Sequence, residues 1–523
     1  MKKILNKIKE VNLKHLDFYS FYFVLGLCIW PVLTQTYFVT LDGPSHLYNA
    51  RLIFEFIVNS PVNASHIFEF NQYLVPNWIS HFLMAILFIF LPDYLVEKTF
   101  IIGYLLIGAI LFRSIVLHFN SKNYFVSVLI IPILPNALFY FGFYNFCFGF
   151  VAILLVVYSF IKLKNKAPWL LFIGLLFSFL ILYFSHLFTF IIGLALVLIF
   201  SFSKDLKGIK KREILIILLA ALPGLILTIN YFIKIDSFSI YDESSISELF
   251  LNLINVNPLL GLCVCKPWIL YSRLFGFALL FASILGINKQ LQTSKKINLR
   301  AILLWGFVLS FLILYFIIPN SNLLTDRLLL SFFFLLILTL GVIQLPKVAQ
   351  FVILISVLSL ELKFSQKLPK VLRSLSSTVE NTRALVKDIP KDTFILSFNF
   401  HTNWLHQHSA SYIGSVNGAT VLDNYEASKP WFPIKYNTSY FKINELNTWG
   451  VKNQNIAPAM YLNHSKRNFF GLDQINGNVY KIKYVVTIDE TFEQEKYFPI
   501  KEALFKSYDL KNEIGKSKLY VLK

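Results

Sequence analysis

The sequence predicts a polytopic α-helical membrane protein with about 11 spans and a C-terminal mixed α/β domain outside the cytoplasm. Of its 523 residues, 56% are hydrophobic and only 15% are charged, a balance unlike that of soluble domains. Long segments such as residues 214–233 and 301–318 contain no charged residue and approach the ~20 residues that a helix needs to cross a bilayer. The basic residues gather in short segments between such spans.

Four basic segments set the predicted topology, because the positive-inside rule places each of them in the cytoplasm. They comprise Lys2, Lys3, Lys7, Lys9 and Lys14; Lys162, Lys164 and Lys166; Lys204, Lys207, Lys210, Lys211 and Arg212; and Lys289, Lys295, Lys296 and Arg300. Counting the later spans from these segments puts the chain after Glu361 outside the cytoplasm. The formal net charge of +19 is thereby explained by topology, and we expect no nucleic-acid partner.

The first half of the chain contains one more apolar segment than the predicted topology allows as membrane spans. Candidates begin near Trp78, Phe100, Tyr124 and Phe146. If all of them crossed, the basic residues 162–166 would lie outside the cytoplasm. We predict that residues 124–141 fail to cross as a regular helix, because Pro132 and Pro135 each remove a helical hydrogen bond. This segment is therefore expected to be re-entrant or broken.

The last third of the chain is predicted to be a separate soluble domain. Hydropathy falls after Glu361, so we divide the chain into a transmembrane domain, residues 1–365, and a soluble domain, residues 366–523. The soluble part is predicted to have helices at residues 374–387 and 491–508 and strands at residues 393–398, 479–488 and 518–522. This order of elements indicates a small mixed α/β domain.

The first outer loop, residues 36–76, holds the segment most informative about function, which opens with Asp42. After Pro44, which is acceptable in a first helical turn, apolar residues recur at helical spacing. They are Leu47, Ala50, Ile53, Phe54 and Ile57. This spacing predicts an amphipathic helix lying on the membrane surface. Asp42 then either caps that helix or is a functional carboxylate.

The layout of the chain resembles the GT-C superfamily of membrane glycosyltransferases, in a divergent bacterial branch. One span, an outer loop that opens with an acidic residue, many further spans and a C-terminal outer domain follow in order, and the match in motif is residues 42–51. The resemblance implies that a sugar is taken from a polyprenyl-phosphate carrier, with Asp42 as the base or the orienter of the acceptor. The oligosaccharyltransferase and protein mannosyltransferase branches fit poorly, because Gly43 stands where they have a second acidic residue.

A leaving lipid phosphate would need cationic or hydrogen-bonding partners. The candidate substrate-binding residues, in the first outer loop or near outer ends of spans, are His46, Arg51, Asn145, His186, Asp326 and Arg327. Structural alternatives exist for them. Arg51 can reach lipid headgroups, His186 can satisfy an interhelical hydrogen bond, and Arg327 can anchor at the membrane interface or pair with its neighbour.

Three other groups of residues have two interpretations each. Residues 141–149, which contain Asn145, either line a sugar or isoprenoid groove or simply pack. Residues 401–408 contain three histidines without a nearby acidic residue, so we predict no metal site there, while a divalent cation remains an open alternative among cofactors. Aromatic residues of the soluble domain either stack on carbohydrate or form its core: Trp404, Tyr412, Tyr425, Trp431 and Tyr436.

The leading functional hypothesis is a transferase at the outer face of a bacterial inner membrane. Its expected partners are the lipid bilayer, a lipid-linked sugar donor and a glycan, lipid or protein acceptor. The first alternative is a transporter or lipid flippase, which should carry ionisable residues inside its spans or related halves. The second is a non-catalytic membrane subunit that docks a partner through its C-terminal domain. An O-antigen ligase or polymerase fits less well, because the loop of residues 236–266 has few Arg or His residues.

Overall fold

The structure, a computed structural model, describes residues 2–58, 67–202, 211–234, 244–262, 266–293, 298–320, 323–390, 393–401, 403–421, 424–437, 483–493 and 498–523. The chain forms two compact units. Unit 1 consists of Met1–Pro31 and Ile101–Leu368, and unit 2 consists of Val32–Phe100 and Pro369–Lys523. Three helices contribute residues to both units: α1 (Lys2–Leu33), α5 (Asp93–Phe119) and α15 (Lys347–Leu385).

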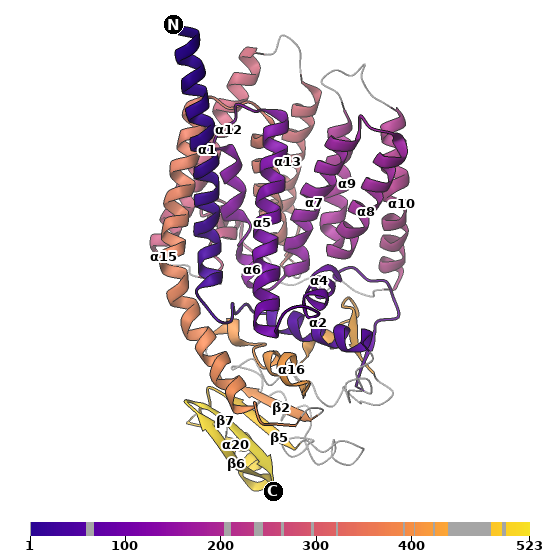
Figure 1. Ribbon diagram of the computed structural model, residues 1–523, viewed down its shortest axis with the longest axis vertical. Helices are drawn as coiled ribbons and strands as arrows, with labels where there is room; N and C mark the ends of the chain where they lie inside the picture. Colours follow the sequence, from indigo (N-terminus) through magenta and orange to yellow (C-terminus); the bar gives the residue numbers. More distant parts are fainter. Residues whose placement is uncertain are drawn as a thin grey trace. The chain divides into compact units, whose positions relative to one another are not determined.

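Unit 1 is a bundle of apolar helices (Figure 1). Besides those three it contains α6 (Ala137–Tyr140), α7 (Tyr144–Leu163), α8 (Pro168–Ser185), α9 (Leu187–Ser201), α10 (Lys211–Lys234), α11 (Ile246–Ile254), α12 (Lys266–Thr293), α13 (Leu299–Ile317), α14 (Leu324–Val342) and the 3₁₀ helices η1 (Val126–Ile133) and η3 (Asn257–Leu259). Among the described residues, nine helices are long and apolar enough to cross a membrane, and two shorter apolar helices accompany them. The chain is a multi-span helical membrane protein, as the sequence predicted.

The apolar segment that begins at Trp78 was counted as a span, and this prediction was wrong. It forms α4 (Ile79–Leu87), a helix of nine residues in unit 2. At 1.5 Å per residue such a helix is about 13 Å long, less than half the hydrocarbon thickness of a bilayer. The chain turns at residues 88–91, directly before Pro92. Apolar composition alone did not reveal this turn, and α4 packs on α2 (Gly43–Ile57) instead.

Residues 124–141 do not form a regular helix, so the predicted break is confirmed, but the segment leads from the end of α5 back to the start of α7, and the candidate that fails to cross is the one that begins at Trp78. The segment consists of η1, which contains Pro132, followed by the single turn α6. It runs back along α5: Arg113 Nη1 donates to Ser127 Oγ at 2.9 Å, and Tyr104 Oη donates to the carbonyl of Leu134 at 2.9 Å. Tyr104 and Arg113 are nine residues apart in the α-helix α5, and their partners Leu134 and Ser127 are seven residues apart in the 3₁₀ segment. Both distances correspond to about 14 Å, so the two segments match in length while they run in opposite directions. The segment is therefore a broken helix that returns antiparallel to α5.

One end of unit 1 carries the basic residues on which the topology prediction depends. The charges of Lys162 and Lys164, at the end of α7, act on His118, at the end of α5. Arg300, just inside α13, also acts on His118, and its Nη2 donates to the carbonyl of Phe202, after α9, at 2.7 Å. Lys162, Lys164 and Arg300 thus share one end of the bundle, in agreement with the positive-inside rule.

A buried ion pair joins three elements inside unit 1. Asp17 of α1 is 3% exposed, and its carboxylate accepts hydrogen bonds from Arg113 Nη2 at 2.6 Å and from the backbone N–H of Phe125 at 2.8 Å. Arg113 also donates to Ser127 and lies over the ring of Phe21, 4.7 Å from its centroid. The pair is internally satisfied and ties α1 to α5 and to the start of η1.

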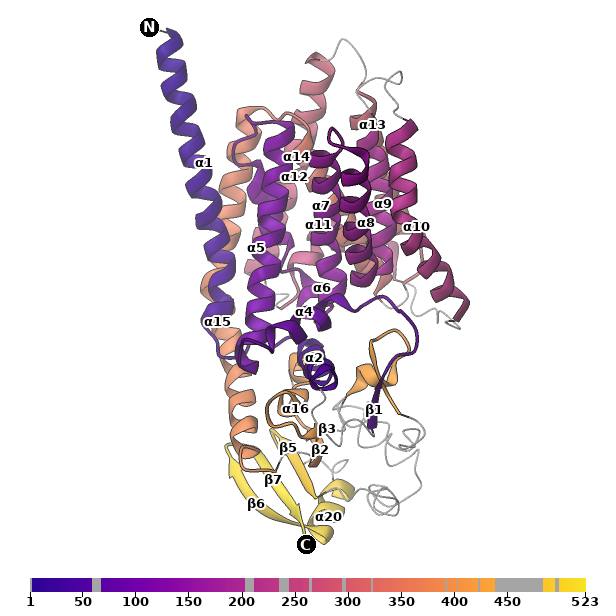
Figure 2. The same cartoon turned by 45° about the vertical axis from the view of Figure 1, so that its right-hand side comes forward.

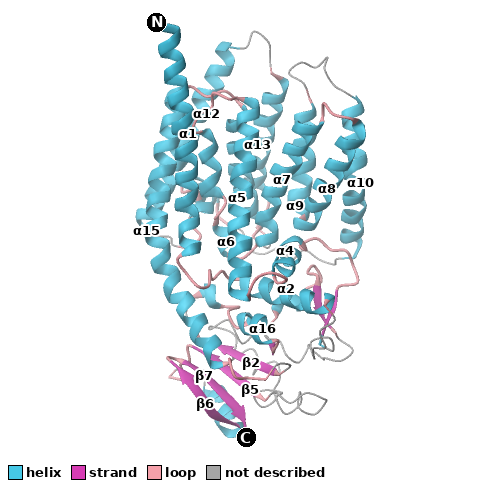
Figure 3. Cartoon of the chain, in the orientation of Figure 1, coloured by secondary structure: helices cyan, strands magenta, loops and turns pink. Residues whose placement is uncertain are grey.

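Unit 2 contains a five-stranded mixed sheet in the order β3-β2-β5-β7-β6 (Figure 3). The strands are β3 (Thr420–Val421), β2 (Phe394–Asn399), β5 (Tyr484–Ile488), β7 (Ser517–Leu522) and β6 (Tyr508–Ile514), and α20 (Phe498–Ser507) precedes β6. β2 pairs in parallel with β3 and β5, whereas β7 pairs antiparallel with β5 and β6. All residues of β2 and β5 are buried, as expected for central strands covered on both faces.

Most of the helices and strands predicted for the soluble part lie where the sequence placed them. β2 and β7 lie where strands were predicted, and β5 covers the described part of the predicted strand 479–488, of which residues 479–482 lie outside the described residues. The predicted helix at residues 374–387 is the continuation of α15, and that at residues 491–508 is shortened to α20. The mixed α/β prediction is confirmed.

The first outer loop and the C-terminal segment fold together in unit 2. β1 (Phe68–Phe70) pairs antiparallel with β4 (Ile434–Tyr436), and Figure 2 shows these short strands side by side. α2 packs on α4 and on α16 (Ser411–Asn417). Short 3₁₀ turns, η4 (Trp404–His406) and η5 (Tyr425–Ser428), flank α16. Residues more than 300 positions apart in sequence thus share one fold.

α2 is not the amphipathic surface helix that the sequence predicted. Its polar residues His46 and Asn49 are 2% and 0% exposed, and Glu55 is 5% exposed. The helical spacing of its apolar residues was predicted correctly, but its polar residues were wrongly expected to face solvent. That side instead meets hydrogen-bonding groups from distant parts of unit 2, which only the tertiary structure supplies.

Candidate functional site

The carboxylate of Asp42 does not cap α2. Asp42 occupies the N-cap position, but its side chain makes no capping hydrogen bond. The N–H of Gly43 donates instead to Thr40 Oγ1 at 3.1 Å, and Pro44 needs no partner in the first turn. The capping interpretation is therefore wrong, and the carboxylate is available for other contacts.

Asp42 lies in a buried polar environment built by the C-terminal part of the chain. Its side chain is close to His408, with 3.6 Å between Oδ1 and Nε2, and it accepts a hydrogen bond from Tyr425. The rings of His408 and Tyr425 stack, with centroids 4.2 Å apart. Burial raises the pKa of Tyr425 well above its ordinary value, and the charges of Asp42 and Glu426 add to this effect. The phenol consequently stays protonated and donates to the carboxylate.

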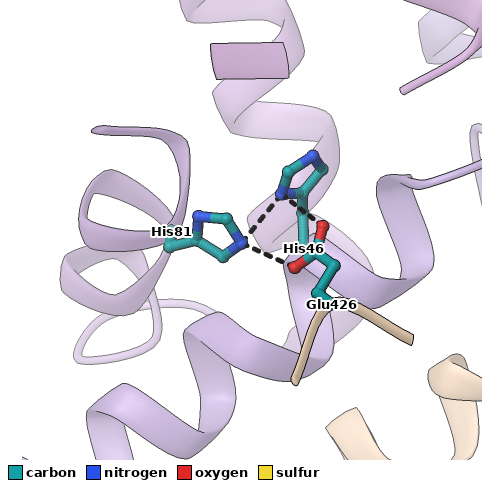
Figure 4. Close-up of side chains that lie close together, drawn as sticks. All are labelled: His46, His81 and Glu426. Atoms are coloured by element: carbon teal, nitrogen blue, oxygen red, sulfur yellow. Dashed lines mark hydrogen bonds and ion pairs between the residues drawn. The ribbon is translucent and has the colours of Figure 1, made fainter. Parts of the chain in front are cut away.

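A second cluster lies one helical turn along α2. His46 of α2, His81 of α4 and Glu426 of η5 point toward one another (Figure 4). His46 Nδ1 is 2.8 Å from His81 Nε2 and 3.1 Å from Glu426 Oε1, and His81 Nε2 is 2.9 Å from Glu426 Oε2. All three side chains are buried, so these polar atoms meet without bulk water. Two imidazoles and a carboxylate in this arrangement have the composition of a metal-ligand set.

Asparagine side chains fix the carboxylate of Glu426. Asn49 Nδ2 donates to Glu426 Oε2 at 2.5 Å, and Asn424 Nδ2 donates to Asn49 Oδ1 at 2.6 Å. Burial raises the pKa of Glu426 to about 7, although the charge of His46 and the hydrogen bond from Asn49 oppose this rise. Burial also lowers the pKa of His81 to about 3, so its imidazole is neutral at physiological pH. His81 and Glu426 therefore do not form an ordinary ion pair.

Several members of these clusters were not predicted from the sequence. Asp42 and His46 are four residues apart, which places them on the same side of α2. Nothing in the sequence connects that side of α2 with His81, Tyr425 or Glu426. His408 was considered only as part of a histidine-rich segment. Tertiary structure alone brings these residues together.

The predicted substrate-binding residue Arg51 has an internal partner. Its Nε donates to Glu55 Oε1, one turn further along α2, at 2.6 Å. The guanidinium lies over the rings of Phe54 and Phe88, 5.2 Å and 5.5 Å from their centroids. These contacts are those of a structural arginine.

In unit 1, Arg327 and His186 both contact the ring of Phe146. The guanidinium of Arg327 is 5.3 Å from the ring centroid of Phe143 and 5.4 Å from that of Phe146. The ring of Phe146 meets that of His186 edge to face at 5.0 Å. His186 Nδ1 also accepts a hydrogen bond from the N–H of Phe188 at 3.1 Å and so caps α9.

The remaining candidates of unit 1 lie beside this cluster in sequence. Asn145 precedes Phe146 in α7 and is 4% exposed. Asp326 precedes Arg327 in the first turn of α14, and the two charges act on each other, although no ion pair in direct contact joins these side chains among the described residues. Arg327 is thus a cation held against aromatic rings, without a carboxylate partner among the described residues.

Two other interpretations of the soluble domain concern its histidines and its aromatic residues. The rings of His401 and His406 contact each other, with centroids 4.0 Å apart, while His408 faces Asp42, so these histidines do not converge on one point. Of the aromatic residues considered for carbohydrate stacking, Tyr412, Tyr425 and Tyr436 are at most 7% exposed and belong to the core, whereas Trp404 is 39% exposed and Trp431 is half-buried, so the stacking interpretation stays a prediction for these two tryptophans.

Comparison with known proteins gives likeness of structure only. No protein-family model matches the sequence, and no curated protein sequence matches it. The chain is similar to the crystal structure of ArnT from Cupriavidus metallidurans in the apo state, with 10% identity and a TM-score of 0.44 over 99% of this chain and 98% of that one. It is also similar to the structure of the same ArnT bound to undecaprenyl phosphate, with 9% identity and a TM-score of 0.39 over 98% and 97% of the two chains.

Proposed function

We propose that this protein is a membrane glycosyltransferase, which moves a sugar from a polyprenyl-phosphate-linked donor to an acceptor at the outer face of the bacterial inner membrane. The observation that carries the proposal is the state of Asp42. It is a buried carboxylate in the first outer loop that does not cap its helix, and its polar neighbours include two groups able to orient it, Tyr425 and His408. A residue of this kind is suited to proton transfer.

In the proposed reaction, Asp42 accepts the proton of an acceptor hydroxyl while the oxygen attacks the anomeric carbon of the sugar. A new glycosidic C–O bond forms, and the C–O bond to the carrier phosphate breaks. The phosphate leaves with the bonding electron pair. The hydrogen bond from Tyr425 holds the carboxylate in one orientation, so that its second oxygen faces the acceptor. Proton transfer by a positioned carboxylate contributes about 10²–10⁴-fold to a rate.

The central test is Asp42→Asn, assayed with purified full-length protein in detergent. Synthetic polyprenyl-phosphate sugars serve as donors and a bacterial lipid extract supplies acceptors, with release of polyprenyl phosphate measured by mass spectrometry. The variant should fold normally and lose transfer by about 100-fold or more. Asp388→Asn, a change at an exposed aspartate of the same unit, is the matched control and should keep full activity. Near-normal transfer by Asp42→Asn would remove the proposed base.

The proposal also requires unit 2 to face away from the cytoplasm. The shared end of the basic segments in unit 1 supports this sidedness. A phosphatase reporter fused after Lys523 should be active only when it is exported. Activity of a cytoplasmic reporter at the same position would overturn the orientation.

A transporter or lipid flippase is the second candidate, and Glu361 is the observation that favours it. This carboxylate is buried at 1% exposure inside α15, and its Oε1 accepts no hydrogen bond from a described residue. Ionisable groups within spans often mark transport pathways. Glu361→Gln separates the two functions, because it should abolish lipid transport into liposomes if the chain is a flippase and leave sugar transfer intact if it is a transferase.

A further inference from the structure

We propose that His46, His81 and Glu426 form a binding site for a divalent transition metal, with zinc as the preferred ion. The three ligand atoms all lie within 4.8 Å of one another and come from three elements of unit 2. This inference goes beyond the proposed sugar transfer and does not depend on it.

The hydrogen-bond pattern of His81 leaves the correct nitrogen for a metal. His81 Nδ1 lies 3.1 Å from the carbonyl oxygen of Asn77. A carbonyl oxygen only accepts, so Nδ1 carries the ring hydrogen and Nε2 presents its lone pair. That lone pair faces His46 Nδ1 and Glu426 Oε2. Backbone carbonyls commonly fix metal-binding histidines in this way.

The ligand atoms of His46, His81 and Glu426 offer more hydrogen-bond acceptors than hydrogens, and such a site favours a bound cation. His81 Nε2 and both oxygens of an ionised Glu426 are acceptors, and only one hydrogen, on His46 Nδ1, is available to this set of atoms from within the cluster. Converging acceptors in a buried site repel one another unless a proton or a metal lies between them. Glu426 Oε1 accepts no hydrogen bond from a described residue although it lies 3.1 Å from His46 Nδ1.

The distances require little adjustment to hold zinc. Zinc bonds of about 2.0–2.2 Å place tetrahedral ligand atoms about 3.3–3.6 Å apart. The observed separations are 2.8 Å, 2.9 Å and 3.1 Å, so each must open by less than about 1 Å. Two histidines and one glutamate are a known zinc set that leaves the fourth position to water or substrate.

Supporting contacts resemble the outer shell of a metal site. Asn49 donates to Glu426 Oε2, and Asn424 orients Asn49 while capping η5 through its own Oδ1. Hydrogen bonds of this kind fix a ligand carboxylate, and their removal typically weakens metal binding about 10- to 100-fold. A bound metal would hold α2, α4 and η5 together and so position Asp42 and Tyr425, which are neighbours of the ligands along the chain.

The test measures metal binding by the full-length protein purified with a histidine-free tag. The protein is stripped with a chelator and titrated with ZnCl₂ against a chromophoric competitor. We expect about one zinc per chain and a rise in the thermal midpoint on the order of 5 °C at saturating zinc. His81→Gln and Glu426→Gln should each weaken binding by at least about 100-fold, and Asn49→Ala by about 10- to 100-fold. His401→Gln, a histidine of the same unit outside the cluster, should bind like the unchanged protein.

The alternative is that His46, His81 and Glu426 form a hydrogen-bond network that shares a proton and binds no metal. In that case the stripped, unsubstituted protein takes up no stoichiometric zinc from the chromophoric competitor, and zinc leaves its thermal midpoint unchanged. This result would overturn the proposal without relying on any variant to fold. Asp42→Asn keeps the two inferences apart. It should bind zinc normally while losing transfer, and normal zinc binding together with retained transfer would reject only the enzymatic proposal.

Discussion

Two buried aspartates, Asp17 in unit 1 and Asp42 in unit 2, have opposite surroundings. Asp17 is 3% exposed and receives hydrogen bonds from the guanidinium of Arg113 and from a backbone N–H. Asp42 is 7% exposed and has a histidine 3.6 Å away and a tyrosine hydroxyl, but forms no ion pair with Lys or Arg in the described chain. Asp17 is neutralised by Arg113 within unit 1, whereas the contacts described for Asp42 are to a histidine and a tyrosine hydroxyl.

This difference suggests how a buried carboxylate that stabilises the fold can be told apart from one that serves a reaction. A buried carboxylate matched by a guanidinium is costly to remove, because its partner is then left uncompensated. A carboxylate held by neutral donors is less important for stability and better suited to chemistry. The two arginines Arg51 and Arg327 differ in the same way, since each lies over two phenylalanine rings but only Arg51 has a carboxylate partner among the described residues.

The largest effect on stability is expected for Asp17→Asn. Loss of the charge leaves Arg113 without its counterion inside unit 1, and the free energy of unfolding should fall by about 3 kcal/mol or more. Thermal unfolding in detergent measures the change. Asp42→Asn is the control and should cost less than about 1 kcal/mol, because the amide oxygen still accepts from Tyr425. Equal losses of stability in the two variants would erase the distinction.

Tyr425→Phe should sharpen the proposed role of Asp42. The substitution removes the hydroxyl that orients the carboxylate but keeps the ring stacked on His408. We expect kcat to fall about 10- to 100-fold, with KM nearly unchanged, because orientation matters most in the transition state. Tyr436→Phe, at another buried tyrosine of unit 2, should leave kcat unaltered. A change confined to thermal stability would make Tyr425 a packing residue only.

Arg327→Gln tests whether this arginine, which has no ion pair with a described carboxylate, binds the phosphate of the donor. Charge-assisted hydrogen bonds to phosphate are strong, so KM for the lipid-linked donor should rise about 10-fold or more while the protein stays folded. Arg51→Gln supplies the matched comparison, because that arginine also lies over two phenylalanine rings but is already bound to Glu55. A similar KM increase in both variants would argue against a specific role for Arg327.

The smallest effect is expected for Thr40→Val at the start of α2. The change removes the hydroxyl that accepts from the N–H of Gly43 and should cost about 1 kcal/mol of stability. Thermal unfolding is again the measurement, and transfer by the folded fraction should be unchanged. If Thr40→Val had no effect on stability, the hydrogen bond from the N–H of Gly43 to this hydroxyl would not stabilise the start of α2.

The sequence by itself determined the class of the protein and much of its order. Apolar length identified most of the membrane-spanning helices, since a bilayer demands about 20 apolar residues in each. Alternation and turns located most of the soluble sheet, and two prolines correctly marked residues 124–141 as a broken helix. These features depend on the residues within one short stretch of chain, so the sequence alone is enough to predict them.

Only the tertiary structure decided which polar residues meet. It showed that the segment after Trp78 is a short helix of unit 2, and that the polar side of α2 is buried against the C-terminal part of the chain. It also joined His46 and His81 to Glu426, more than 340 residues further along, and Asp42 to Tyr425. Contacts of this kind depend on how distant segments fold together, and no periodicity within either segment encodes them.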